Sequence, residues 1–167
     1  MKVLLINTYD SGGGAHNFCR LFLDANRDIC KMLVHKKTSN DSSIKEIQEP
    51  FFEKHIPFVD KVLWKLGYKN GFRNTFSLHD SLHYTYKFLE NEPFYKKADI
   101  INLHNIHGSY FDFNALEKIL IEKPVIFSMH DMWAFTGGET YMPGVEEYKT
   151  GVPESPIPKH YPFYGSI

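Results

Sequence analysis

The spacing of apolar residues predicts a βαβ unit at the start of the chain. Short apolar runs typical of buried strands span residues 3–7 and 29–34. Residues 15–25 between them have the periodicity of an amphipathic helix, with an expected buried face made by Phe18, Leu21 and Phe22. A strand, a helix and a parallel strand form a crossover that is almost always right-handed.

Two later apolar runs, over residues 98–104 and 124–130, predict a third and a fourth strand, and each run ends at a histidine. The helical pattern of residues 114–121 lies between them. We therefore predict an α/β fold, a Rossmann-like parallel sheet with helices on both faces. Ligands of such sheets bind outside the carboxyl ends of the strands, so both histidines are expected at that edge.

The other segments add little regular structure to this prediction. Residues 36–43 are polar and indicate a loop, whereas residues 58–66 and 81–89 have helical spacing. Five prolines follow residue 142, so residues 139–167 are expected to be an irregular, proline-rich tail. Four strands without a closing helix are few for this architecture. We therefore interpret residues 1–167 as one domain that is truncated.

Charge and cysteine content narrow the functional classes. The 19 basic and 20 acidic residues give a net charge of −1, which does not favour a nucleic-acid partner. Cys19 and Cys30 have no metal-binding spacing, and unpaired thiols suit the reducing cytoplasm. The apolar start of the chain is too short for a signal peptide or a membrane span, so a cytoplasmic protein is expected.

Three consecutive glycines, Gly12, Gly13 and Gly14, lie between the first strand and the first helix. Glycines at this place let a ligand approach the backbone, and the free N–H groups of a helix start favour an anion such as phosphate. The run matches neither a G-x-G-x-x-G fingerprint nor a P-loop. An ordinary turn between a strand and a helix remains the alternative.

Polar residues gather after the third and fourth strands. The candidates for substrate contact after the third strand are His104, Asn105 and His107. After the fourth strand, His130 is a candidate catalytic residue, and the adjacent Asp131 would set its tautomer. Trp133 offers a flat apolar face to a ligand. Metal ligation is a weaker interpretation, because His-x-x-His is not the i, i+4 spacing of zinc proteases.

Two further patterns have ordinary explanations. His79 and His83 are spaced i, i+4 but lack a third ligand nearby, which favours a solvated helix face. Residues 51–73 carry five basic and two acidic residues among several aromatic ones. Contact with an anionic membrane surface is one interpretation of this segment, and a core-facing amphipathic helix is the favoured one.

Together these segments resemble the N-terminal domain of family 4 glycosyltransferases, of the colanic-acid and exopolysaccharide type. The resemblance rests on the glycine loop, on Ile-Ile-Asn-Leu-His-Asn-Ile-His-Gly at residues 100–108, and on His-Asp-Met-Trp-Ala-Phe-Thr-Gly-Gly at residues 130–138. It implies the GT-B architecture of two Rossmann-like domains around a cleft. It also implies retaining transfer from a nucleotide-sugar donor to a glycan or lipid-linked acceptor, with no cofactor and usually no metal.

The resemblance also implies roles for individual residues. The glycine loop would close on the donor diphosphate, His130 would face the donor sugar, and His104 and Asn105 would line the same cleft. Close relatives often carry four cysteines where this chain has Glu139, Val145, Val152 and Ser155. The family's second domain is not part of these residues, so the chain alone is expected to be inactive. A lipid-linked acceptor implies that the protein contacts the inner face of the cell membrane as a peripheral protein.

Two alternatives come from other functional classes. One is a small metal-dependent hydrolase that uses His104, His107, His130 and Asp131. The other is a non-catalytic binding module that kept the fold and lost the chemistry.

Overall fold

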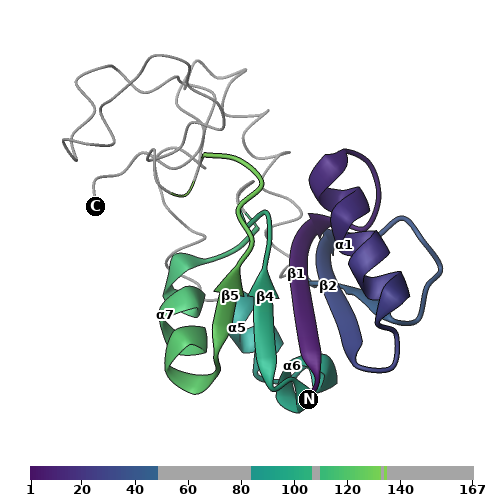
Figure 1. Ribbon diagram of the computed structural model, residues 1–167. Coiled ribbons are helices and arrows are strands. Elements are labelled where there is room, and N and C mark those ends of the chain that lie inside the picture. Colours follow the sequence, from purple (N-terminus) through teal and green to yellow (C-terminus); the bar gives the residue numbers. More distant parts are fainter. Residues whose placement is uncertain (49–83, 107–109, 133, 135–167) are drawn as a thin grey trace, which may run out of the picture.

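The computed structural model describes residues 1–48, 84–106, 110–132 and 134. Their centre is a parallel five-stranded sheet in the order β3-β2-β1-β4-β5 (Figure 1). The strands are β1 (Val3–Tyr9), β2 (Cys30–Lys36), β3 (Ile44–Glu46), β4 (Ile100–Leu103) and β5 (Val125–Phe127). The helices are α1 (Gly14–Ala25), α5 (Tyr84–Leu89), α6 (Pro93–Lys97) and α7 (Phe113–Glu122). The predicted α/β fold with a parallel sheet is confirmed.

The strand order places a topological switch point between β1 and β4. From β1 the chain adds β2 and β3 on one side of the sheet, then crosses to the other side to form β4 and β5. Ile6 of β1 pairs with Leu103 of β4, and the backbone N–H of His104 donates to the carbonyl of Ile6 at 2.9 Å. The carboxyl ends of β1 and β4 therefore lie side by side, where sheets of this kind bind ligands.

The sheet contains one strand more than predicted. Residues 44–46 form β3, in which Ile44 pairs with Met32 of β2 and is fully buried. Three residues following a polar loop are too few to show a strand period, so the sequence pattern missed this strand. The short helix α6 was also missed, although Pro93 stands in its first turn and Glu92 caps it by accepting from the N–H of Phe94.

Side chains of successive residues in the central strands pack into two separate cores, one on each face of the sheet. The α1 face buries Leu5, Cys19, Leu23, Cys30, Met32, Val34 and Ile44. The opposite face buries Leu4, Ile6, Leu33, Ile101 and Leu103 against residues of α5, α6 and α7. Helices therefore cover both faces, as predicted, because alternate side chains of a strand point to opposite sides.

The predicted inner face of α1 is wrong in part. Cys19 and Leu23, spaced i, i+4, are the fully buried residues of this helix, whereas Phe18 and Leu21 are 51% and 70% exposed. Burial of a leucine side chain contributes roughly 1.5–3 kcal/mol, so Leu23 holds α1 firmly on the sheet. The helix is thus rotated so that the Cys19 thiol faces inward.

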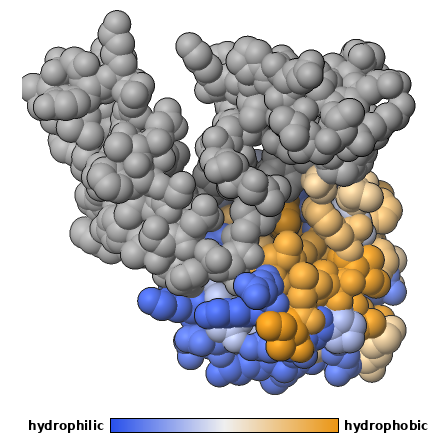
Figure 2. All heavy atoms as spheres, turned by 90° about the vertical axis from the view of Figure 1, so that its left-hand side faces the viewer, coloured by the Kyte–Doolittle hydropathy of each residue, from blue (hydrophilic) through white to orange (hydrophobic). Residues whose placement is uncertain are grey.

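The side of the molecule formed by β5 and α7 exposes apolar surface (Figure 2). Exposed apolar side chains on these two elements and just after β5 are Leu120, Ile121, Ile126, Phe127 and Met129. β5 is an edge strand of the described sheet, and Val125 at its start packs against the core.

Candidate functional site

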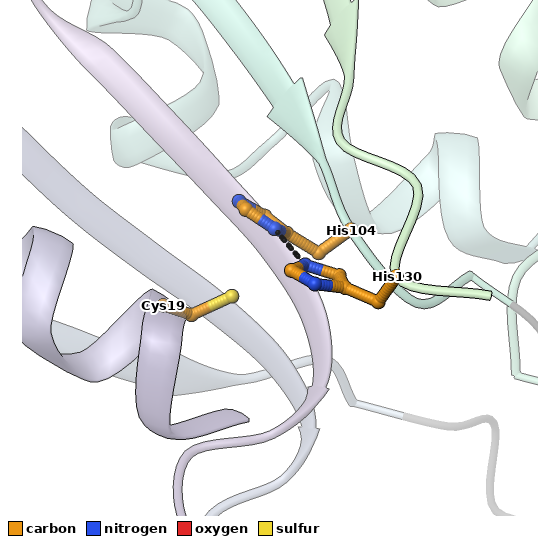
Figure 3. Close-up of side chains that lie close together, drawn as sticks. All are labelled: Cys19, His104 and His130. Atoms are coloured by element: carbon orange, nitrogen blue, oxygen red, sulfur yellow. Dashed lines mark hydrogen bonds between the residues drawn. The ribbon is translucent and has the colours of Figure 1, made fainter. Parts of the chain in front are cut away.

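The two histidines predicted at strand ends meet at the carboxyl edge of the sheet. Beyond β5 the chain stays beside β4, because the N–H of Ser128 donates to the carbonyl of Leu103 at 2.8 Å. His130 follows two residues later. Its Nε2 atom lies 2.8 Å from Nδ1 of His104 in a hydrogen bond (Figure 3). The two rings are nearly parallel, with centroids 5.1 Å apart.

The two rings have different surroundings. His104 is 1% exposed, whereas His130 is exposed. Burial, and to a smaller extent the neighbouring His130, lowers the pKa of His104 to about 4. His104 is therefore neutral at physiological pH, and one ring of the pair donates while the other accepts. The remaining ring nitrogen of His104, Nε2, is buried and has no hydrogen-bond partner among the described residues.

Cys19 completes this group, and the sequence analysis missed it. Its sulfur and one nitrogen of each histidine ring lie within 4.8 Å of one another. The thiol projects from α1 toward the two rings (Figure 3). Burial raises the pKa of Cys19 to about 12, so the free thiol keeps its proton. The sequence did contain a signal for this position. Cys19 and Leu23 are spaced i, i+4, so they could form the buried face of α1 in place of Phe18, Leu21 and Phe22.

Phe18, the neighbour of Cys19 on α1, extends beside the histidine pair. Its ring centroid is 6.0 Å from that of His104 and 5.6 Å from that of His130. Because Phe18 is half exposed, it forms an apolar wall at the edge of the site rather than part of the core.

The glycine loop (Gly12, Gly13 and Gly14) enters the same edge of the sheet from β1. Gly12 has φ +118°, a conformation that side-chain-bearing residues rarely adopt. Gly13 precedes α1 in an extended conformation, and no side chain caps the helix there. All three glycines are exposed, and the space beside Gly13 and Gly14 is open. The start of α1 thus has no side-chain cap, and anion binding by its first N–H groups stays a prediction.

Asp10 fixes the loop that leads to these glycines. Its buried carboxylate accepts hydrogen bonds from the N–H and hydroxyl of Thr38 and from the N–H of Ser39, each at 2.8 Å. Burial acts to raise the pKa of this carboxyl, but hydrogen bonds from Ser39 and Thr38 outweigh it and lower the pKa to about 2. The loop after β1 is thereby tied to the loop after β2.

The segment after His104 is held through the backbone of Asn105. The carbonyl of Asn105 accepts from the hydroxyl of Thr8 at 2.9 Å and from that of Tyr110 at 2.7 Å. Asn105 itself is half buried. These contacts fix the path of the chain directly beyond the buried histidine, and so help to fix His104.

The remaining predicted site residues either lie outside the group of Cys19, His104 and His130 or lie outside the described residues. Asp131 follows His130 and is half buried. Among the described residues, the group that could hold a metal is Cys19, His104 and His130 and does not include Asp131. His107 and Trp133 lie outside the described residues, as do His79, His83, the helix predicted at residues 58–66 and the tail at 139–167.

Comparisons with known proteins gave no significant match, whether against family models, curated proteins or solved structures. Within the described part of the chain, none of the helices has the length and apolar character needed to cross a membrane.

Proposed function

We propose that this chain is the acceptor-side domain of a retaining glycosyltransferase of the GT-B type. The transferase would move a sugar from a nucleotide-sugar donor to a glycan or lipid-linked acceptor in surface polysaccharide synthesis. One observation carries the proposal: His104, His130 and the glycine loop flank the same switch point between β1 and β4.

The glycine loop supplies the part of such a site that faces a diphosphate. A sugar nucleotide leaves as a nucleoside diphosphate, and negative charge builds up on that group during transfer. The exposed N–H groups at the start of α1 and the positive end of its dipole stabilise such a charge. Glycine at these positions leaves room for the phosphate oxygens to approach the backbone.

The exposed and the buried histidine of the pair would have different roles. His130 is exposed and offers a ring nitrogen to a sugar hydroxyl or to the developing charge at the donor sugar. His104 contacts His130 and acts as a positioning residue. Because His104 bonds to Nε2 of His130, the tautomer of His130 depends on His104 in addition to any effect of Asp131.

The remaining parts of the proposal follow the family resemblance. Asn105, His107 and Trp133 would contact the substrate, and the reaction would need no cofactor. A lipid-linked acceptor would bring the protein to the inner face of the cell membrane as a peripheral, cytoplasmic protein.

A nuclear magnetic resonance titration of the 167-residue chain tests the proposal. UDP-glucose and GDP-mannose are added in turn, and the backbone amides and histidine rings are followed. We expect shifts for Gly13, Gly14 and His130 at the carboxyl edge. Lys2 and Asp99, at the amino ends of the strands, serve as internal controls and should not move.

The outcomes separate the competing functions. Absence of shifts at the carboxyl edge with both sugar nucleotides would refute the proposal. Tight, stoichiometric binding would favour a dedicated binding module instead. Sugar transfer or donor hydrolysis by the purified chain would refute the expectation that the donor site is incomplete in these residues.

A further inference from the structure

We propose that Cys19, His104 and His130 bind a zinc ion at the carboxyl edge of the sheet. The proposal does not depend on sugar transfer. It rests on the three side chains that the fold brings together from α1, from the end of β4 and from the segment after β5.

The donor set suits zinc. One sulfur and two imidazole nitrogens are ligands that Zn²⁺ prefers, whereas Mg²⁺ and Ca²⁺ need oxygen donors. With Zn–S near 2.3 Å and Zn–N near 2.0–2.1 Å, ligand atoms of a tetrahedral site lie about 3.3–3.7 Å apart. The three candidate atoms already lie within 4.8 Å of one another. The site therefore needs small side-chain movements and no change of fold.

For both histidines to bind one zinc ion, the hydrogen bond between them must be broken. Its nitrogens are 2.8 Å apart, closer than two ligands of one ion, so the rings must separate or rotate slightly. His130 is exposed, whereas His104 and Cys19 are fully buried, so His130 is the ring that moves. Two fixed ligands and one adaptable ligand form a partly preorganised site.

Binding also changes the state of the thiol. Zn²⁺ coordinates the thiolate, so the Cys19 proton is released to solvent as the Zn–S bond forms. The bound ion then carries one thiolate and two neutral imidazoles, which leaves a net charge of +1 at the site. Three protein ligands leave a fourth position for water on the solvent side, next to exposed His130.

Cobalt spectroscopy of the metal-free chain tests the site directly. Co²⁺ is titrated into the wild-type chain, and Zn²⁺ is then added in competition. We expect one equivalent of Co²⁺ to give a thiolate-to-cobalt charge-transfer band and the intense visible bands of tetrahedral coordination. Zn²⁺ should displace it, with a dissociation constant of about 1 µM or tighter.

Two cysteine variants provide a matched comparison. Cys19→Ala should abolish the charge-transfer band and weaken zinc binding by at least about 100-fold. Cys30→Ala removes the other buried thiol of the same core and should leave the band unchanged. A band that survives Cys19→Ala, or one that is lost in Cys30→Ala while the fold is retained, would overturn the proposal.

A thermal readout covers the case in which a cysteine variant does not fold. Zinc at about 100 times its dissociation constant should raise the unfolding midpoint of the wild-type chain by roughly 5–10 °C. In His130→Ala, where the exposed ligand is lost, most of this rise should disappear. Wild-type protein with neither a cobalt band nor a thermal shift would refute the site. No sugar nucleotide is present, so this result is distinct from failure of the proposed transferase function.

Discussion

Nδ1 of His104 and Nε2 of His130 lie 2.8 Å apart, although 26 positions of the chain separate the two residues. The hydrogen bond links the residue after β4 to the segment after β5 and pairs a buried ring with an exposed one. A substitution therefore has different consequences at the two positions. At His130 the function is affected first, whereas at His104 the structure and the function change together.

The exposed ring gives the first prediction. In a transferase that carries this domain, His130→Ala should lower kcat by about 100–1,000-fold, as expected for loss of one stabilising group at the reacting centre. The free energy of unfolding should fall by about 1 kcal/mol, because the buried Nδ1 atom of His104 loses its hydrogen bond to His130. Steady-state kinetics and urea unfolding measure the two effects. Near-normal transfer by the variant would remove His130 from the proposed mechanism.

The glycine loop gives a prediction about backbone conformation. Gly12→Ala should destabilise the fold by about 1–2 kcal/mol, because alanine is strained at φ +118°. Gly14→Ala is the control. Gly14 is the first residue of α1 and has open space beside it, so alanine there should stabilise by about 0.4–1 kcal/mol. Urea unfolding should therefore move in opposite directions for the two variants, and equal effects would contradict the proposed loop geometry.

Because the pKa of Asp10 is lowered in the folded chain, we expect the stability of the protein to depend on pH. Its pKa is about 2 in the folded chain and 3.8 when unperturbed, so the unfolded chain binds more protons between these values. The stabilisation, roughly 2 kcal/mol, is fully present above pH 4 and is lost as the pH falls toward 2. In Asp10→Asn this contribution is missing. The stability difference between wild type and variant, measured by urea unfolding at several pH values, should shrink on acidification, and a constant difference would disprove the assignment.

Because two hydroxyl groups donate to the carbonyl of Asn105, we expect substitutions of the two donors to have non-additive effects on the free energy of unfolding. Thr8→Val and Tyr110→Phe each remove one of its two donors and should each cost about 1 kcal/mol. Either single variant leaves the carbonyl with a partner. The double variant leaves a carbonyl without either hydroxyl, so its loss should exceed the sum of the single losses by about 1 kcal/mol or more. A strictly additive double-mutant cycle would show that the two hydroxyls do not share this acceptor in solution.

The sequence by itself determined the elements and the edge at which chemistry was expected. The apolar run of β1, the helix α1 and the end of β4 next to His104 were predictable, because they depend on local periodicity. The predicted end of the next strand at His130 was wrong, since β5 ends at Phe127. From parallel strands it followed that both histidines lie at the carboxyl edge. β3 could not be predicted, since its three residues become a strand through pairing with β2.

Only the tertiary structure decided which side chains meet at that edge. Local spacing favoured Phe18 on the inner face of α1, but packing on the sheet buried Cys19 and Leu23 instead. Cys19 thereby reached the histidine pair from a distant part of the chain. The rotation of a helix and the neighbours of a strand are set by burial of apolar surface between elements. This property belongs to the assembled sheet and is absent from any single segment.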